Sequence, residues 1–319
     1  MFDVVMPLYN KEQFVTAAVE SVLRQTFPDW RLHVIDDGSV DRGPEEVARF
    51  QDPRITLVRQ SNQGVGPARN AGIDAGSADW IAFLDSDDVW SPNHLAELDR
   101  LRRTFSDAVL IGCGFSELGG HPPRSTGQAR RTRARPARYF AECARGRQLF
   151  FTSSAAVRRS ALDEVGLFES LPGNEDVELW ARLALHGPVA VSSKRTVQYR
   201  VGTGGITDRE AQSAKADFRA LRREDMSSTI PTITKRLPAI VDPKLRQDLH
   251  AYMDSRIGVA LVAAVRAGNI AYARHILSLL EGRPRGKAQL AALIAKLPEP
   301  IGKRVSALAM KLKPLVSRG

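Results

Sequence analysis

The sequence predicts an α/β fold in which a mostly parallel sheet is flanked by helices. Short apolar runs typical of buried strands alternate with segments of helical periodicity over residues 1–95. Such alternation indicates βαβ units with right-handed crossovers, which place parallel strands side by side. Three of the predicted strands end in polar clusters, and parallel strands bring such ends to one edge of a sheet. Open α/β sheets bind ligands at that edge, so we expect a ligand site there.

The first half of the chain supplies four predicted strands and three predicted helices. Pro7 is expected to end the first strand, because proline cannot donate to a central ladder. A Gly-rich loop at 62–66 precedes the third helix. Strands are expected at 2–6, 31–35, 55–58 and 80–84, and helices at 12–25, 45–50 and 67–75.

Three carboxylates follow the predicted strand at 80–84 within four positions, namely Asp85, Asp87 and Asp88. Asp85 and Asp87 are two residues apart, so on an extended chain their side chains point the same way. They repel each other unless a cation lies between them, and Mg²⁺ usually shares protein carboxylates with substrate phosphates. The alternative is a solvated acidic turn in which Asp88 caps a helix. Asp36 and Asp37 end the second predicted strand, where Gly38 makes a plain turn the alternative.

The second half of the sheet is less regular in sequence. Strands are expected at 109–113 and 150–157, a helix from Ser160, and one or two edge strands at 189–200. Glu175 and Asp176 begin a helix with a buried apolar stripe, and the helix macrodipole favours ionised carboxylates there. Simple capping of that helix is the alternative interpretation.

Positive charge is concentrated late in the chain, whose formal net charge is +10. Residues 121–147 hold eight arginines and one acid, with interleaved proline and glycine, which predicts a basic loop. This loop is either simply solvated or faces an anionic acceptor or lipid head groups. Helix formers dominate beyond residue 207, with two helices expected over 253–280. The basic tail at 283–319 has apolar residues at helical spacing, so it either lies on an anionic membrane or packs as a terminal helix.

Several classes of protein are excluded by composition. Two cysteines, Cys113 and Cys143, provide neither a disulfide framework nor metal-ligand spacing, and reduced thiols suit the cytosol. We find no secretory signal and no apolar run near the roughly 18 residues of a membrane span. Nucleic acid is not an expected partner, because no helix-turn-helix, zinc or RNA-binding signature is present. The dinucleotide fingerprint G-x-G-x-x-G is absent after the first strand.

Motifs along residues 1–95 resemble, in order and spacing, those of the family 2 inverting glycosyltransferases with the GT-A fold. A further motif near residue 176 is similar to the downstream Glu-Asp motif of that family. The segments are Val4-Val-Met-Pro7-Leu-Tyr9-Asn10, Ser21-Val-Leu-Arg-Gln25-Thr26-Phe27, Val34-Ile-Asp36-Asp37-Gly38-Ser39, Asn62-x-Gly64 with Ala68-Arg69-Asn70-Ala-Gly72, Phe83-Leu-Asp85-Ser-Asp87-Asp88, and Glu175-Asp176-x-Glu178-x-Trp180-x-Arg182.

The resemblance implies a GT-A nucleotide-diphospho-sugar transferase fold, with a Rossmann-like sheet and a helical C-terminal extension. It implies a GT-A domain at 1–208, divided into a nucleotide-binding half at 1–95 and an acceptor and catalytic half at 96–208 that includes the basic loop 121–147. The helical extension would cover 209–319 and carry the basic amphipathic tail.

The resemblance also implies a metal-assisted, inverting transfer from a nucleotide-diphospho-sugar to a hydroxyl of a glycan, glycolipid or other acceptor. A UDP-sugar is the favoured donor, and Mg²⁺ or Mn²⁺ the implied metal. Asp176 matches the general base, although Glu175 stays an alternative. The other implied roles concern the nucleotide and the metal. Pro7, Tyr9 and Asp37 would contact the nucleobase, and Arg69 would help to hold the nucleotide. Asp85 would lie near the ribose, and Asp87 would bind the metal.

One departure from the family pattern concerns the segment after the Glu-Asp helix. A Tyr-Arg-x-His sequence is common there, but Tyr199-Arg200-Val-Gly202 has no histidine. Arg200 or Gly-rich backbone amides are expected to contact the diphosphate instead. A cytoplasmic protein, peripheral on the inner face of the plasma membrane, fits the basic tail. A sugar nucleotidyltransferase and a catalytically silent nucleotide-sugar-binding protein are the alternative functions, and the first is disfavoured because no Gly-rich basic loop follows the first strand.

Overall fold

The computed structural model describes residues 1–118, 133–171, 174–204, 229–266, 269–278 and 287–302. The chain divides into two compact units. Met1–Glu142 and Gln148–Thr203 form the first unit, and Cys143–Arg147 and Gly204–Gly319 form the second. All site residues predicted from the sequence lie in the first unit.

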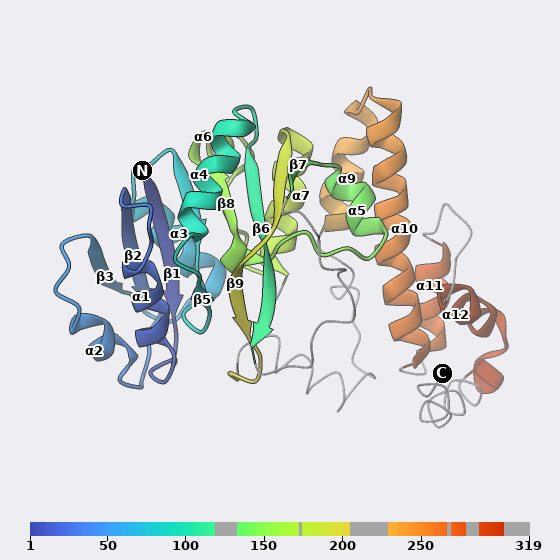
Figure 1. Ribbon diagram of the computed structural model, residues 1–319. Helices are drawn as coiled ribbons and strands as arrows, with labels where there is room; N and C mark the ends of the chain where they lie inside the picture. Colours follow the sequence, from blue (N-terminus) through green and yellow to red (C-terminus); the bar gives the residue numbers. More distant parts are fainter. Residues whose placement is uncertain (119–132, 172–173, 205–228, 267–268, 279–286, 303–319) are drawn as a thin grey trace. The chain divides into compact units, whose positions relative to one another are not determined.

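The first unit is built on a mixed sheet with the strand order β3-β2-β1-β4-β8-β6-β9-β5, and β7 pairs with β9 (Figure 1). The parallel arrangement predicted for the first half is confirmed, since β3, β2, β1 and β4 all run the same way. β8 is antiparallel to both β4 and β6, whereas β6 and β9 are again parallel. The strands are β1 (Phe2–Leu8), β2 (Trp30–Asp36), β3 (Ile55–Arg59), β4 (Trp80–Phe83), β5 (Val89–Trp90), β6 (Leu110–Leu118), β7 (Ala134–Ala137), β8 (Ala155–Arg158) and β9 (Val189–Arg200).

Helices cover both faces of β1, which is buried along its whole length. Val4 and Met6 share one core cluster with side chains of α1 and α4, whereas Val5 faces Gly72 of α3. This alternation follows from the period of two along a strand. The helices of this unit are α1 (Val15–Leu23), α2 (Gly43–Ala48), α3 (Val65–Ala75), α4 (His94–Thr104), α5 (Tyr139–Ala144, which runs on into the second unit), α6 (Arg159–Val165) and α7 (Glu175–His186), with a 3₁₀ turn η1 (Thr152–Ser154).

Pro7 lies inside β1, opposite Ile35, so the expectation that it ends the strand is wrong. The carbonyl of Leu8 accepts from the Asp37 N–H on the β2 side, and the carbonyl of Val5 accepts from the Leu84 N–H on the β4 side. By alternation the nitrogen of Pro7 faces the β4 side, where the register with β4 ends at Val5. The missing N–H therefore removes no ladder hydrogen bond.

Two further segments differ from expectation. Part of the predicted basic loop is ordered, since β7 pairs with β9 and α5 follows it, while residues 119–132 lie outside the described residues. Arg135 donates to both oxygens of Glu142 at 2.7 and 2.6 Å, which offsets one of the positive charges and joins β7 to α5. In the predicted strand at 150–157, only the part from Ala155 onward belongs to a strand, and Thr152–Ser154 form a 3₁₀ turn.

The described part of the second unit is helical, which confirms the predicted helical C-terminal region. The two helices expected over 253–280 are α10 and α11, although α10 begins ten residues earlier than expected. No helix in the described ranges combines the length and apolar character that a membrane crossing needs. The basic tail from 303 onward lies outside the described residues. The elements are α9 (Thr229–Arg236), a 3₁₀ turn η4 (Leu237–Ala239), α10 (Pro243–Arg266), α11 (Ile270–Ser278) and α12 (Lys287–Lys296).

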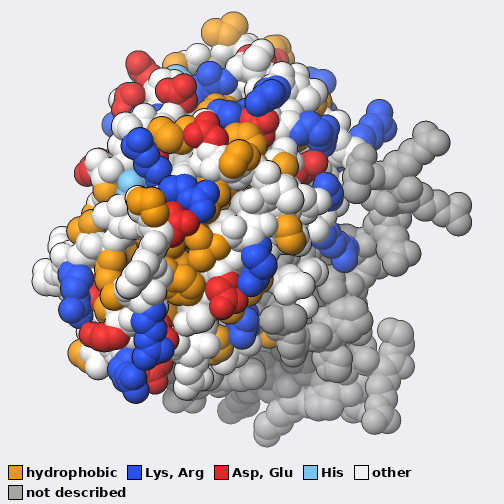
Figure 2. Space-filling view, turned by 60° about the vertical axis from the view of Figure 1, so that its left-hand side comes forward, with side chains coloured by type: hydrophobic (Ala, Val, Ile, Leu, Met, Phe, Trp, Pro, Cys, Tyr) orange, Lys and Arg blue, Asp and Glu red, His pale blue; other side chains and the backbone are white. Residues whose placement is uncertain are grey.

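Basic and acidic side chains are interspersed on the face of the molecule that Figure 2 shows. Some exposed arginines of the first unit directly follow a helix and are ion-paired with an acid of that helix, as Arg24 is with Glu20 of α1 and Arg49 with Glu46 of α2. The positive charge that the described part presents on this face is therefore scattered and not gathered into one field.

Candidate active site

The carboxyl ends of β1, β2 and β4 come together at one edge of the sheet, as the parallel arrangement predicts. The N–H of Asn10, which follows β1, donates to the Ser39 hydroxyl after β2 at 3.1 Å. Lys11, also after β1, reaches Asp87 after β4 at 2.6 Å. The polar clusters found in the sequence therefore belong to one site.

Asp37 at the end of β2 fixes the loop that leads into α3. Its Oδ1 accepts hydrogen bonds from the Gln60 side chain and the Gln63 N–H at 2.8 and 2.9 Å. Its Oδ2 accepts from the Gly64 N–H at 2.8 Å, and the side chain is buried. Gly64 has a φ of 95°, a conformation that favours glycine, and it begins α3. Asp37 is thus a positioning group for the Gly-rich loop at the edge of the site.

Tyr9 and Asn10 form the rim next to β1. Tyr9 is 40% exposed, so its ring is available to a ligand, whereas Pro7 is buried within the strand. Asn10 has a φ of 52°, which is uncommon outside glycine, and its side-chain oxygen accepts from the Val40 N–H at 2.9 Å. This clamp reverses the chain direction after β1 and aims the next residue at the β4 acids.

A buried arginine of α3 joins the β4 end to the start of α7. Arg69 donates to Asp85 at 2.8 Å and to Glu175 at 2.6 Å, and its guanidinium lies 5.4 Å from the centre of the Phe168 ring. Burial alone would lower the pKa of Arg69, but Asp85 and Glu175 raise it above its ordinary value. Arg69 is therefore a permanent cation that holds two acids in place.

Asp85 and Asp88 share Ser153 of η1 as a partner. The Ser153 hydroxyl accepts from the Asp85 N–H at 3.0 Å and hydrogen-bonds Asp88 Oδ2 at 2.5 Å. Burial raises the pKa of both acids, in Asp88 to about 8, with the neighbouring Asp85 charge adding to the effect. Asp88 also accepts from the Arg200 N–H at 2.9 Å. Asp88 thus links the end of β4 to the end of β9. The alternative interpretation, in which Asp88 caps a helix, is wrong.

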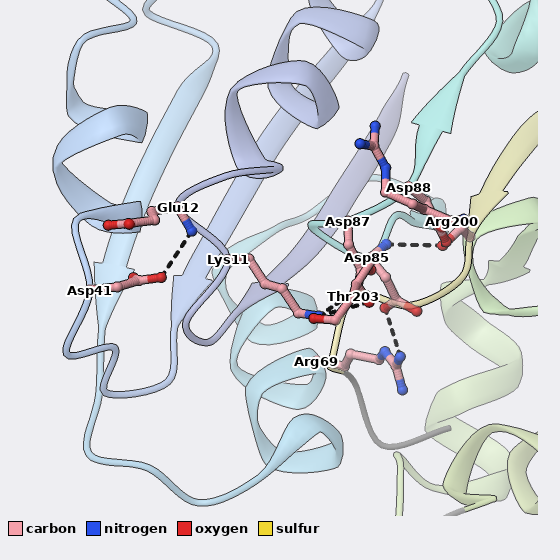
Figure 3. A network of polar contacts seen from close by, with 10 residues as sticks. Lys11, Glu12, Asp41, Arg69, Asp85, Asp87, Asp88, Arg200 and Thr203 are labelled. Atoms are coloured by element: carbon pink, nitrogen blue, oxygen red, sulfur yellow. Dashed lines mark hydrogen bonds and ion pairs between the residues drawn. The ribbon is translucent and has the colours of Figure 1, made fainter. Parts of the chain in front are cut away.

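Asp87 is held by an ammonium group. Lys11 Nζ lies 2.6 Å from Asp87 Oδ2, and the Thr203 hydroxyl donates to the same oxygen at 2.6 Å (Figure 3). Lys11 also donates to the carbonyl and the hydroxyl oxygen of Thr203 at 3.0 and 3.1 Å. The negative charge of Asp87, the acid predicted to bind metal, is therefore compensated by the ammonium group of Lys11.

The two acids at the start of α7 have different partners. Glu175 is buried and ion-paired with Arg69. Asp176 is partly exposed, and its Oδ2 accepts from the Thr152 hydroxyl at 2.7 Å while Oδ1 accepts from the Val177 N–H at 2.7 Å. Of the two, Asp176 is the one whose carboxylate is free of an ion pair among the described residues and open to solvent.

The remainder of the Glu-Asp motif is structural. Arg182 donates to both oxygens of Glu178 at 3.0 and 2.8 Å and to the carbonyl oxygens of Val165 and Leu167 at 2.7 Å each. Trp180 packs against the rings of Phe83, Phe150 and Phe168, with centroids 6.0 to 6.2 Å apart. These contacts anchor α7 against β4 and α6 and so set the place of Asp176.

Arg200 is half-buried at the end of β9. Its backbone reaches Asp88, and its guanidinium carbon lies 5.0 Å from the centre of the Phe14 ring. Its Nε has no hydrogen-bond partner within the described residues. A buried polar atom without a partner is unfavourable, and this N–H can still donate one hydrogen bond. An acceptor that a ligand brings would therefore stabilise it.

Oxygen ligands are the donor set that this edge offers to a metal. Within the described residues no group of three or more histidine, cysteine or acidic side chains is arranged to hold a metal ion. Mg²⁺ and Mn²⁺ sites of phosphate-handling enzymes need only one or two carboxylates when substrate phosphates supply the other oxygens. Asp87 fits that requirement, with the condition that Lys11 gives up its place there, whereas Asp85 is held by Arg69.

Four residues of the site are absent from the sequence prediction. Thr152 and Ser153 lie in a segment that sequence reasoning assigns to a strand, and hydroxyl residues carry no pattern of their own. Thr203 follows the position where a histidine is common in the family, and Lys11 follows the Tyr9-Asn10 pair directly. The position of Lys11 directly after a strand-end motif was the one feature of the sequence that could have pointed to a site residue.

Comparisons with known proteins place the chain in one family. The family model described as glycosyl transferase family 2 matches residues 3–166. The UDP-Glc:alpha-D-GlcNAc-diphosphoundecaprenol beta-1,3-glucosyltransferase WfgD of Escherichia coli is 42% identical over 96 residues, which are 30% of this chain and 38% of that protein. The succinoglycan biosynthesis protein ExoW of Rhizobium meliloti is 46% identical over 98 residues, 29% of this chain and 31% of that protein. The matched segments thus span about a third of these relatives' own length.

Two solved structures share the fold. TarS 1–349 of S. aureus, solved in complex with UDP-GlcNAc, superposes with a TM-score of 0.59 at 16% identity, covering 92% of this chain and 90% of that one. The mannosyltransferase PcManGT of Pyrobaculum calidifontis, solved with GDP-Man and Mn²⁺, gives a TM-score of 0.61 at 19% identity, covering 100% of this chain and 88% of that one. The GT-A fold predicted from the sequence is thereby confirmed.

Proposed function

The chain belongs to glycosyl transferase family 2, and from that membership we propose that it moves a sugar from a nucleotide-diphospho-sugar to an acceptor hydroxyl with inversion at the anomeric carbon. The GT-A domain is proposed to end at residue 208, before a helical extension over 209–319. Residues 1–95 would bind the nucleotide, and residues 96–208 would supply the acceptor side and the base.

The bridge made by Arg69 is the observation that carries this proposal. It ties Asp85, on the side expected for the donor, to Glu175, which directly precedes Asp176. A donor bound at the β4 edge would therefore have the proposed base close to its reactive sugar. Nucleophile, base and leaving group must be positioned together for a single displacement.

Asp176 is proposed as the general base. Glu175 is engaged by Arg69, whereas Asp176 is partly exposed and oriented by the Thr152 hydroxyl. Asp176 would accept the proton of an acceptor hydroxyl while that oxygen forms a bond to the anomeric carbon. The bond from that carbon to the diphosphate breaks on the opposite face, and the nucleoside diphosphate leaves with the bonding electron pair. One displacement of this kind inverts the configuration.

Asp87 is proposed to hold Mg²⁺ or Mn²⁺ together with the donor phosphates, and Asp85 to lie near the ribose. When bound, such an ion neutralises charge that develops on the diphosphate leaving group. Pro7, Tyr9 and Asp37 are proposed to form the pocket for the nucleobase, and Arg69 to help hold the nucleotide. Arg200, whose Nε has no partner among the described residues, is proposed to donate to the diphosphate.

The acceptor is proposed to be a glycan or a glycolipid used in polysaccharide synthesis. WfgD is named for glucosyl transfer to GlcNAc-diphosphoundecaprenol, and ExoW for succinoglycan biosynthesis. Acceptors of that kind are held at membranes. We propose that the protein is cytoplasmic and peripheral on the inner face of the plasma membrane, where its basic tail would contact anionic lipid.

Nucleotide release from a panel of UDP-, GDP- and dTDP-sugars tests the proposal, with and without acceptor and with added Mn²⁺ or EDTA. A transferase releases nucleoside diphosphate from one class of donor, and a UDP-sugar is the expected one. Formation of nucleotide-sugar from sugar phosphate would instead indicate a nucleotidyltransferase. Binding of a donor without release of nucleoside diphosphate, whichever acceptor is added, would indicate a catalytically silent binding protein.

A further inference from the structure

Lys11 is an internal cation at the acid that is proposed to bind metal. An ammonium group has three donors, and here all three are used, toward Asp87 Oδ2, the Thr203 carbonyl and the Thr203 hydroxyl. The side chains of Lys11 and Asp87 are only 12% and 16% exposed. A lysine this deeply placed requires partners, and this set satisfies it completely.

Two specialised turns build the contact. Asn10 holds a φ of 52°. The next residue, Lys11, extends to Asp87 after β4 (Figure 3). On the other side Thr203 stands between Gly202 and Gly204, whose φ values of 79° and 74° favour glycine. The lysine and its acceptors are therefore presented by backbone geometry that few other residues adopt. A chance surface ion pair does not depend on such geometry.

We propose that Lys11 is the resident counter-cation of Asp87, that a divalent metal displaces it, and that the displaced ammonium then binds the donor diphosphate. This inference rests on the proposed function, since it assigns a role within the same donor site. A metal ion and an ammonium group cannot share one carboxylate oxygen without repulsion. The lysine head sits on a flexible four-carbon stem, so it can leave Asp87 without movement of β1.

Charge balance favours this exchange over simple loss of the contact. Lys11 and Asp87 form a neutral pair in the absence of donor. A divalent metal and a sugar-nucleotide diphosphate carry charges that cancel, so the site stays balanced when both enter together. The metal alone would leave Lys11 without an anion in a poorly solvated place, which is unfavourable. Metal and nucleotide are therefore expected to bind cooperatively, with each weak in the absence of the other.

Calorimetric titration with Mn²⁺ alone, and with UDP alone in EDTA, tests the inference on the full chain. In Lys11→Met the Mn²⁺ affinity should rise about tenfold, because no ammonium group competes for Asp87. The metal-free UDP affinity should fall about tenfold, because the uncompensated Asp87 then repels the diphosphate. Lys194→Met is the matched control, since it removes an equal charge from a lysine at 3.8 Å from Glu97 and should change neither affinity. Asp87→Asn should abolish the Mn²⁺ binding that Lys11→Met gains.

Unchanged or weaker Mn²⁺ binding in Lys11→Met overturns the inference, as does an absence of Mn²⁺ binding in both proteins. Thr203→Val is the second variant if Lys11→Met does not fold, and should raise Mn²⁺ affinity by a smaller factor. The proposed function has its own readout in nucleotide release by the unaltered protein. Release that persists while Lys11→Met shows no shift defeats the inference alone, whereas a shift without any release defeats the proposed function alone.

Discussion

Arg69 and Glu175 are 106 residues apart in the chain, yet their side chains meet at 2.6 Å in a buried ion pair. The same guanidinium holds Asp85 at 2.8 Å. One residue thus connects the two halves of the first unit at the site. Its removal should be felt in stability as well as in binding, because it leaves two acids without compensation.

Arg69→Met should lower the free energy of unfolding by about 3–5 kcal/mol, the cost typical of breaking a buried ion pair on one side. Urea unfolding followed by circular dichroism measures the change. Arg69→Lys keeps the charge but loses the planar fork that reaches two acids, so it should recover only part of the stability. Equal stability of Arg69→Met and the unaltered protein would show that the bridge is not a structural element.

Asp176→Asn should reduce sugar transfer about 10²–10⁴-fold, the range typical of losing a general base, with nucleotide affinity retained. Release of nucleoside diphosphate and calorimetric binding separate the two effects. Thr152→Val, which removes the hydroxyl that orients Asp176, should cause a smaller loss in the rate constant. Glu175→Gln should instead lower stability through Arg69, so a selective loss of rate there would reverse the assignment of the base.

We expect the stability of the protein to depend on pH because of the buried His94. It is buried against Trp90, its Nδ1 lies 2.7 Å from the Thr196 hydroxyl, and burial lowers its pKa to about 3. The unfolded chain, with an ordinary histidine pKa near 6.5, binds a proton that the folded protein excludes. The stability that His94 contributes is therefore present above about pH 6.5 and is lost as the pH falls towards 3, by at most about 1.4 kcal/mol per pH unit.

His94→Gln should have a flatter profile between these pH values. The difference between the two proteins in urea unfolding at pH 4.5 and 7 isolates the histidine from the carboxylates. Parallel profiles would mean that His94 takes up a proton without unfolding.

Gly72→Ala should destabilise the protein by about 1–3 kcal/mol, as overpacking commonly does. A methyl group there would lie 2.4 Å from Val5 Cγ1, between α3 and β1. Asp74→Ala, at an exposed position of the same helix, supplies the matched control for helix propensity. A stabilised Gly72→Ala would show that α3 can move away from β1 at little cost.

The basic tail should bind anionic vesicles weakly, with an affinity that falls as salt is raised. Co-sedimentation with phosphatidylserine vesicles at two salt concentrations measures this. A variant ending at Gly302 keeps α12 and lacks five basic residues, so it should bind less. Equal binding by both proteins would place the membrane contact elsewhere or remove it.

The parallel half of the fold is predictable because its strands are mostly apolar and three of them are followed by polar clusters. Burial on both faces forces that composition on β1, and the same rule finds β2 and β4. The antiparallel β8 is not predictable from its four residues, since their direction is decided by the neighbours β4 and β6. Sequence patterns likewise overlook β7, whose order depends on pairing with β9 and on the ion pair of Arg135 with Glu142.

The acids of the site are visible in sequence because they follow strand ends and a helix start. Their partners are not, because a hydroxyl or an ammonium becomes part of a site through tertiary contact alone. Thr152, Ser153 and Thr203 reach Asp176, Asp88 and Asp87 across 24, 65 and 116 residues. Such distances leave no local pattern, and only the folded chain identifies these residues.

The contact between Lys11 and Thr203 spans 192 residues, and β9, which runs just before Thr203, is a parallel neighbour of β6. During synthesis on the ribosome, the strand ends that carry Asp37 and Asp87 emerge long before β9 does. A nascent chain of the first 95 residues therefore has these acids and Lys11, but it lacks the hydroxyl groups of Thr152, Ser153 and Thr203 and the helix α7. The contacts around Asp87 can therefore be completed only after nearly the whole first unit has been synthesised, since Thr203 follows β9.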